Sequence, residues 1–163
     1  MISTLKDEFG YRVTLWIHPF VNLECPSWSY AALPPISYFV KDKKGKSGIG
    51  NLPGLTWWWQ GVLASYVDFT NPLATDWWSQ RLENLRSYYG IDSFKFDAGE
   101  SNWLPSSFLL NEGIDQRYWP AAFTTAYVDA VSKFGSMIEV RVGRRTQKHP
   151  IFVRMGPYIC QTR

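Results

Sequence analysis

Ile91-Asp92-Ser93-Phe94-Lys95-Phe96-Asp97-Ala98-Gly99-Glu100 is an apolar, β-favouring run that follows Gly90 and ends in two carboxylates separated by two small residues. Glycine after a helix commonly adopts the left-handed conformation that ends it, so a new element is expected to begin at Ile91. The run predicts a buried parallel strand whose C-terminal end presents Asp97. In (β/α)-barrel enzymes the reacting groups lie at the C-terminal ends of strands, which makes Asp97 the leading candidate.

The segment before this strand predicts a strand–helix–strand unit. Residues 65–69 have the composition of a short strand, and Asn71 and Pro72 are suited to the cap and the first position of a helix. Apolar residues then recur every three or four positions, which predicts a helix over residues 72–89. Six positions form the expected apolar face: Leu73, Trp77, Trp78, Leu82, Leu85 and Tyr89. We expect strands 65–69 and 91–96 to pair in parallel with a right-handed connection.

Further elements extend this pattern on both sides. Strands are expected within residues 11–20, 137–142 and 151–154, and a second helix from Arg117 to Phe134, with Tyr118, Ala122, Thr125, Val128 and Phe134 among its inward positions. Four or five strands with helices between some of them indicate an α/β fold. A complete eightfold barrel needs about 250 residues. We therefore expect residues 1–163 to form a fragment of a catalytic domain, a partial (β/α)8 TIM barrel with about half of the barrel and its central strands.

Two regions show no sustained helical or strand periodicity in their apolar residues. Residues 25–51 are rich in Pro, Ser, Gly and Lys and are expected to form a long loop, in which residues 41–46 make a solvated turn. Trp57, Trp58 and Trp59 are consecutive, so they cannot all face one side of a strand or helix. At least one of them is expected to face a cavity or solvent.

The amino-acid composition and charge favour some classes of function and exclude others. Aromatic residues make up 17% of the chain, which is compatible either with stacking on sugars or with an aromatic core. The net charge of +3 comes from scattered residues, so no nucleic-acid partner is expected. No signal peptide and no apolar run of bilayer-spanning length is present, and no metal-ligand spacing of His or Cys occurs. The oligomeric state is not indicated.

The candidate chemistry centres on Asp97. A carboxylate at a strand end can attack an anomeric carbon, and Lys95 lies on the same strand face. The alternative is a structural ion pair between these two residues. Arg141 ends its strand in the same manner and either pairs with Asp97 or substrate, or forms an ordinary surface salt bridge. Glu100 either binds sugar hydroxyls or caps a turn, and His18 is interpreted as a packed histidine in preference to a reacting one.

Several motifs together resemble glycoside hydrolase family 31. Phe94–Glu100 is similar to the family's nucleophile strand. The remaining similar segments occur in the family's order: residues 15–20, 58–61, 68–72, 139–143 and 145–156. The resemblance implies a retaining α-glycosidase on a (β/α) barrel, of α-galactosidase type, with no metal and no organic cofactor. It implies that Asp97 is the nucleophile and that four residues contact the sugar: Lys95, Glu100, Arg141 and Trp59. The similar branch of the family is membrane-anchored in the endoplasmic reticulum or nuclear envelope.

The sequence departs from the family at Pro157, where the family has the Asp that acts as general acid/base, and residues 157–163 form a tail without resemblance. A retaining mechanism needs a second carboxyl group roughly 5–5.5 Å from the nucleophile. Three functional hypotheses follow: an α-galactosidase-type hydrolase that is incomplete in this chain, a non-catalytic fragment or isoform with a sugar-binding or interaction role, and an unrelated carbohydrate-binding module that uses its tryptophans.

Overall fold

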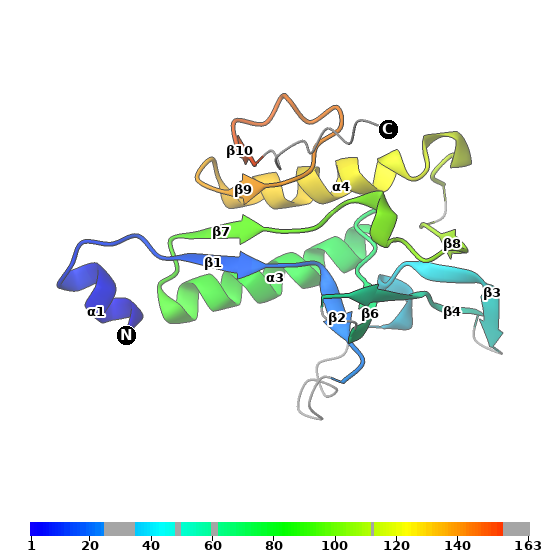
Figure 1. Cartoon of the computed structure of the whole chain (residues 1–163), viewed down its shortest axis with the longest axis horizontal. Helices are drawn as coiled ribbons and strands as arrows, with labels where there is room; N and C mark the ends of the chain where they lie inside the picture. The colour runs from blue at the N-terminus through cyan, green and yellow to red at the C-terminus, as the bar shows by residue number, and fades with distance from the viewer. Residues whose placement is uncertain (25–34, 48–49, 60–61, 112, 155–163) are drawn as a thin grey trace, which may run out of the picture.

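The centre of the molecule is a four-stranded parallel sheet with the order β1-β7-β9-β10. The computed structural model describes residues 1–24, 35–47, 50–59, 62–111 and 113–154. The sheet comprises β1 (Thr14–Ile17), β7 (Ser93–Phe96), β9 (Glu139–Val140) and β10 (Phe152–Val153). The arrows of β1, β7 and β9 point the same way in Figure 1, so their carboxyl ends meet at one edge. The predicted strand 91–96 and the α/β class are therefore confirmed.

The helix α3 (Pro72–Tyr89) forms where the sequence predicts it. The Asn71 side chain accepts a hydrogen bond from the backbone N–H of Leu73 at 3.0 Å, and Gly90 ends the helix with φ 67°. Trp78 and Leu82 are buried, but Leu73 and Tyr89 are exposed, so the predicted apolar face is wrong at its two ends. A helix of 18 residues is about 27 Å long, whereas a strand of four residues spans about 13 Å, so the sheet is too short to cover the whole length of the helix.

The predicted pairing of residues 65–69 with strand 91–96 is wrong. The strand there is β6 (Val62–Tyr66), which pairs antiparallel with β2 (Phe20–Asn22) and β5 (Leu55–Trp58) in a separate sheet. The parallel partners of β7 are β1 and β9. The strand–helix–strand unit is therefore β1-α3-β7, and the residues between β1 and α3 form an insertion. Local composition identified a strand but carried no information about its partner.

The predicted loop over residues 25–51 is wrong in its second half, while residues 25–34 lie outside the described part of the chain. The predicted turn at residues 41–46 is β3 (Lys41–Ser47), which pairs antiparallel with β4 (Gly50–Pro53) and with β8 (Phe108–Leu109). The backbone N–H of Lys43 donates to the carbonyl of Ser107 at 2.8 Å. Because the partner strand β8 is so distant in the sequence, the composition of β3 alone does not predict that it forms a strand. In Figure 1 the insertion lies beyond the carboxyl ends of β1 and β7.

The predicted helix over residues 117–134 is divided into three parts: η3 (Gln116–Tyr118), α4 (Ala121–Val131) and η4 (Ser132–Phe134). Pro120 lies just before α4 and has no N–H to continue a helical ladder. Val128 and Phe134 are buried as predicted, but Tyr118 is exposed because it precedes the break. The remaining helical turns of the described chain are α1 (Ile2–Asp7), η1 (Ile36–Tyr38) and η2 (Ser101–Trp103).

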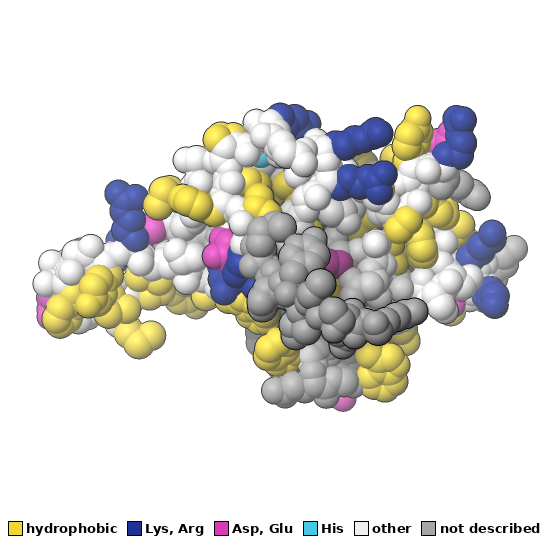
Figure 2. Space-filling view, turned by 45° about the horizontal axis from the view of Figure 1, so that its top comes forward, with side chains coloured by type: hydrophobic (Ala, Val, Ile, Leu, Met, Phe, Trp, Pro, Cys, Tyr) yellow, Lys and Arg dark blue, Asp and Glu magenta, His cyan; other side chains and the backbone are white. Residues whose placement is uncertain are grey.

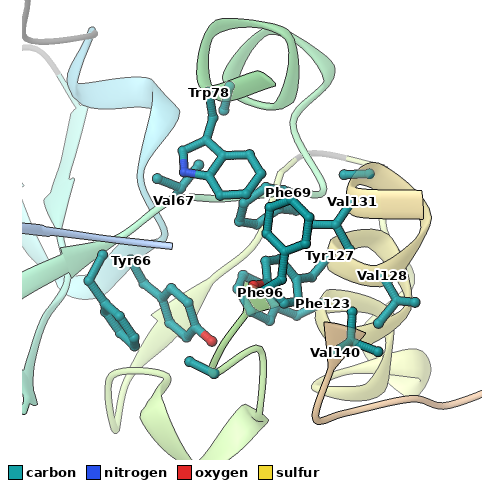
Figure 3. Packing of buried hydrophobic residues seen from close by; sticks show 14 of the residues in the cluster. Tyr66, Val67, Phe69, Trp78, Phe96, Phe123, Tyr127, Val128, Val131 and Val140 are labelled. Atoms are coloured by element: carbon teal, nitrogen blue, oxygen red, sulfur yellow. The ribbon is translucent and has the colours of Figure 1, made fainter. Parts of the chain in front are cut away.

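An aromatic core joins the sheet, its helices and the insertion (Figure 3). Tyr66 of β6 lies 4.5 Å from Phe123 of α4 between ring centroids, and Trp78 of α3 lies 5.7 Å from Phe96 of β7. Trp58 is also buried and stacks on Phe20 at 4.3 Å. Many of the aromatic side chains therefore fill the core, which is one of the two roles, core packing or stacking on sugars, that the composition allowed.

The surface shows where apolar side chains remain exposed. Met1, Phe9 and Tyr11 are exposed, and yellow side chains are visible at the α1 end of the molecule in Figure 2. This end lies opposite the carboxyl ends of the parallel strands. Across the described residues, none of the helices is both long enough and apolar enough to cross a membrane.

Candidate active site

The carboxyl ends of the four parallel strands bring their polar side chains together. Asp97 directly follows β7, Arg141 follows β9, and Arg154 follows β10. His18 follows β1 in the same way. The parallel register aligns Trp16 with Lys95 and Lys95 with Glu139, so these three side chains share the face of the sheet opposite Phe94 and Phe96.

The Asp97 carboxylate is nearly buried, with a side-chain exposure of 10%, and is surrounded by donors from different strands. Its Oδ2 accepts a hydrogen bond from Trp16 Nε1 at 2.9 Å. Its Oδ1 accepts from the backbone N–H of Ala98 at 3.0 Å and from Arg154 Nη2 at 3.3 Å. Arg141 Nε adds an ion pair to Oδ1 at 3.1 Å. Two cations and two N–H groups therefore surround the Asp97 carboxylate in a site that excludes most water.

Arg141 joins Asp97 to Glu100. Its Nε lies 2.5 Å from Glu100 Oε1, in addition to its contact with Asp97. These contacts are ion pairs without hydrogen-bond alignment, because Arg141 Nε has no partner that meets hydrogen-bond geometry among the described residues. The other oxygen, Glu100 Oε2, is buried and has no described hydrogen-bond partner. The structure thus brings three of the predicted site residues together: Asp97, Glu100 and Arg141.

The turn after β7 explains how two carboxylates reach one arginine. Ala98 and Gly99 both have positive φ, 60° and 92°, which reverses the chain between Asp97 and Glu100. Tyr66 and Tyr127 hold this turn from opposite sides. The Tyr66 hydroxyl accepts from the Gly99 N–H at 2.9 Å, and the Tyr127 hydroxyl donates to the Asp97 carbonyl at 2.8 Å. Burial raises the pKa of both tyrosines well above the ordinary value, so both stay protonated.

Lys95 lies beside Asp97 but pairs elsewhere. Its Nζ is 3.9 Å from Glu139 Oε1, and the same oxygen accepts from Arg154 Nε at 2.8 Å. The alternative of an ion pair between Lys95 and Asp97 is therefore wrong. The partner Glu139 aligns with Lys95 across β7 and β9, a neighbour that could be found only once the strand order was known.

A cavity of about 590 Å³ opens beside Asp97. Its lining consists of Trp16, His18, Asn22, Trp58, Trp59, Lys95 and Asp97. Trp59 is exposed with φ 29°, and its ring centroid lies 6.1 Å from that of Trp16. Trp57 is exposed while Trp58 is buried, so the three tryptophans face different surroundings as predicted. Two aromatic side chains, Trp16 and Trp59, therefore stand beside a carboxylate in one pocket, an arrangement suited to a sugar.

His18 takes part in this pocket as a half-buried neutral group. Its Nδ1 accepts from the Phe20 N–H at 3.3 Å, and its ring packs on Trp16 with centroids 5.0 Å apart. Burial lowers the pKa of His18, while the negative charge of Asp97 opposes that shift. The packed-histidine interpretation describes these contacts well, although the pocket position was not predicted.

Trp16 and Arg154 are the two contacts of Asp97 that sequence reasoning missed. Arg154 follows a strand in the same manner as Arg141, so the rule used for Arg141 would have found it. Trp16 lies two residues before His18 on the same strand face, but only the register with Lys95 shows that it reaches Asp97. Pro157 and the tail lie outside the described residues. Within the described ranges, no cluster of three or more His, Cys, Asp or Glu side chains is arranged for a metal.

Comparison with known proteins shows what this chain is similar to. Residues 1–154 match the family model of the glycosyl hydrolases family 31 TIM-barrel domain. The myogenesis-regulating glycosidase of Mus musculus is 37% identical over 155 residues, which cover 95% of this chain and 20% of the relative. An alpha-xylosidase of Emericella nidulans is 34% identical over 102 residues, covering 61% of this chain and 11% of the relative. The chain thus spans about a fifth or less of these relatives.

A third relative and a solved structure complete the comparison. A sulfoquinovosidase of Agrobacterium fabrum is 26% identical over 134 residues, covering 81% of this chain and 18% of the relative. The cycloalternan-degrading enzyme from Trueperella pyogenes superposes with a TM-score of 0.70 at 23% identity, covering 90% of this chain and 22% of that structure. This structural likeness supports the fold alone.

Proposed function

The chain belongs to glycosyl hydrolase family 31, and its parallel sheet is part of that family's TIM barrel; on this premise we propose that Asp97 is the nucleophile of a retaining α-glycosidase site. The observation that carries the proposal is the position of the Asp97 carboxylate. It lies at the carboxyl end of β7, lines the cavity, and is held by donors from β1 and from the residues after β9 and β10. Barrel enzymes place their reacting groups at this end.

The proposed chemistry begins with attack of Asp97 on the anomeric carbon of an α-glycoside. A covalent glycosyl-enzyme forms, the bond to the leaving group breaks, and water later releases the sugar. Four residues are proposed to contact the sugar: Lys95, Glu100, Arg141 and Trp59. Lys95 and Trp59 line the cavity with Asp97, and the unpartnered Glu100 Oε2 supplies an acceptor for a sugar hydroxyl.

The proposed substrate is an α-galactoside, following the branch of the family that the sequence motifs indicate. One relative is named a myogenesis-regulating glycosidase, and two others are named an alpha-xylosidase and a sulfoquinovosidase. A panel of sugars therefore decides the substrate. The same branch motivates the further proposal that a longer parent protein is anchored in the endoplasmic reticulum or nuclear envelope membrane.

Turnover by this chain needs a separate test, because the sequence resemblance aligns Pro157 with the family's general acid/base. A proline cannot donate a proton to a leaving oxygen, and loss of a general acid or base costs about 10²–10⁴ in rate. We expect no hydrolysis of aryl α-galactosides by residues 1–163. Hydrolysis that disappears in Asp97→Asn would overturn this expectation.

The nucleophile can be tested without the acid/base. A 5-fluoro-α-galactosyl fluoride carries a leaving group that departs as fluoride without receiving a proton, and the fluorine on C5, next to the ring oxygen, slows release of the trapped sugar. Intact-mass measurement is expected to show one added glycosyl group on the wild-type chain and none on Asp97→Asn. The α-xylosyl and α-glucosyl analogues report the sugar preference. A wild-type chain that no analogue modifies would contradict the proposed function.

A second candidate function is sugar binding without catalysis, favoured by the two tryptophans that stand at the cavity. Titration of α-methyl galactoside against Trp59→Ala and Asp97→Ala separates the two. A binding module loses affinity with the tryptophan change and forms no covalent adduct with the fluorides, whereas a glycosidase site is modified at Asp97.

A further inference from the structure

The two oxygens of the Asp97 carboxylate have different surroundings. Oδ1 accepts two hydrogen bonds, from Ala98 N and Arg154 Nη2, and also faces Arg141 Nε. Oδ2 accepts one hydrogen bond, from the neutral indole N–H of Trp16. Each carboxylate oxygen offers about two lone-pair sites. Those of Oδ1 are therefore occupied, and Oδ2 keeps one available.

The side chain that contacts Oδ2 lines the cavity, whereas the arginines that contact Oδ1 are not among its described lining residues. Trp16, which contacts Oδ2, lines the cavity together with Asp97, whereas Arg141 and Arg154, which contact Oδ1, are outside the described lining. A substrate in this cavity therefore approaches Asp97 from the Oδ2 side. The two cations neutralise charge mainly at Oδ1, which leaves the less compensated oxygen directed at the substrate.

The ring of Trp16 contacts two other rings at the cavity. Trp16 lies on β1 in register with Lys95, and its indole packs between His18 and Trp59, with centroid distances of 5.0 Å and 6.1 Å. An indole N–H only donates and cannot remove a proton or carry a charge. It can therefore hold Oδ2 at a fixed angle without neutralising it.

We infer that Oδ2 is the oxygen of Asp97 that forms the bond to the anomeric carbon, and that Trp16 is the positioning residue that orients it. This inference rests on the proposed function, because it concerns the same nucleophile. In the step with a glycosyl fluoride, the bond from Oδ2 to C1 forms, the C1–F bond breaks, and fluoride leaves with the bonding electron pair.

Trp16→Phe tests the inference because it keeps an aromatic ring and removes the N–H. Saturation kinetics of trapping with the 5-fluoro glycosyl fluoride that modifies the wild-type chain separate the maximal rate from the half-saturating concentration. We expect the maximal rate to fall about tenfold or more, in line with loss of a hydrogen bond to a charged group. The half-saturating concentration is expected to stay within about twofold, since the ring that faces the sugar is retained.

Trp57→Phe is the matched control, because Trp57 is exposed on β5 and lies outside the cavity lining. It is expected to be trapped at the wild-type rate. The indole N–H resonance of Trp16 in the wild-type chain supplies a second measurement, and it should move upfield in Asp97→Ala as the hydrogen bond is lost.

The outcomes separate the two proposals. A wild-type chain that is not trapped overturns the proposed function and, with it, this inference. Normal trapping of folded Trp16→Phe at the wild-type maximal rate overturns the inference alone. An unchanged indole resonance in Asp97→Ala does the same, even if Trp16→Phe fails to fold.

Discussion

The parallel sheet with its two helices, here called the wall, and the antiparallel insertion differ in how their strands find their partners. The wall consists of β1, β7, β9 and β10 with α3 and α4 packed against them, and its core includes Trp78 of α3, Phe96 of β7 and Val128 of α4. The insertion, residues 18–71, contains β2 to β6, and two of its strand pairings join distant segments, β2 with β6 and β3 with β8. Local sequence patterns thus predict the elements of the wall, whereas the strand pairing of the insertion depends on residues that are far apart in the sequence.

The two regions also supply different parts of the site. The wall contributes the charged groups Asp97, Arg141 and Arg154 at its strand ends. The insertion contributes Trp59 to the cavity and Tyr66 to the turn after β7. The chemistry therefore depends on the wall, and the shape of the pocket depends on how the insertion is attached to it.

The largest expected effect comes from breaking the aromatic contact between the two regions. Phe123 of α4 is fully buried against Tyr66 of β6. Phe123→Ala is expected to lower the free energy of unfolding by about 3–5 kcal/mol, through lost burial and the cavity left behind. Urea denaturation measures this change. Trp57→Ala, at an exposed site of the insertion, serves as the control, and an equal loss there would contradict the distinction.

The turn that holds Asp97 gives the next effect. A Cβ on Gly99 would lie 2.3 Å from Tyr127 Cδ1 and 2.7 Å from Val142 Cγ2. Gly113 has the same φ of 92° but nothing within 4 Å of its position, so it is matched for backbone conformation. Gly99→Ala is expected to cost about 1–3 kcal/mol more than Gly113→Ala in the free energy of unfolding. Equal costs would show that Tyr127 does not constrain the turn.

Sequence reasoning recovered the wall far better than the insertion. The strand 91–96 and helix 72–89 were predicted because Asn71, Pro72 and Gly90 are local signals. The pairing of β6, the strand at Lys41–Ser47 and the Lys95–Glu139 contact were missed because each depends on a partner far away in the chain. Asp97, Glu100 and Arg141 were brought together as expected since parallel strands end at one edge. The contact between Trp16 and Asp97 could be predicted only once the strand register was known.

The junction between the insertion and α3 is expected to show a smaller effect. Asn71 caps α3 through the Leu73 N–H and also donates from Nδ2 to the Ser37 carbonyl at 3.0 Å. Asn71→Ala is expected to cost about 0.5–2 kcal/mol in thermal or urea unfolding. Asn84→Ala, on the exposed face of the same helix, should stay within about 0.5 kcal/mol of wild type. A cap variant as stable as Asn84→Ala would show that this junction adds nothing.

The smallest effect concerns pH. Burial lowers the pKa of His18 in the folded chain below its ordinary value of 6.5, partly offset by the charge of Asp97. In the unfolded chain His18 therefore binds a proton more readily than in the folded chain. The free energy of unfolding is unaffected by His18 above pH 6.5, and it decreases as the pH falls from 6.5 through the pKa of His18 in the folded chain. Wild type should lose more stability between pH 7.5 and 5 than His18→Gln in urea titrations. Parallel losses would contradict the burial of His18 as the cause.

Peptide mapping after trapping with a 5-fluoro-α-glycosyl fluoride tests the assignment of the nucleophile most directly. The predicted result is a single glycosyl group on the peptide that contains Asp97, located on that residue by fragmentation, with no adduct in Asp97→Asn. A glycosyl group on another carboxylate, such as Glu100 or Glu139, or no adduct with any of the sugars, would contradict the placement of the nucleophile at the end of β7.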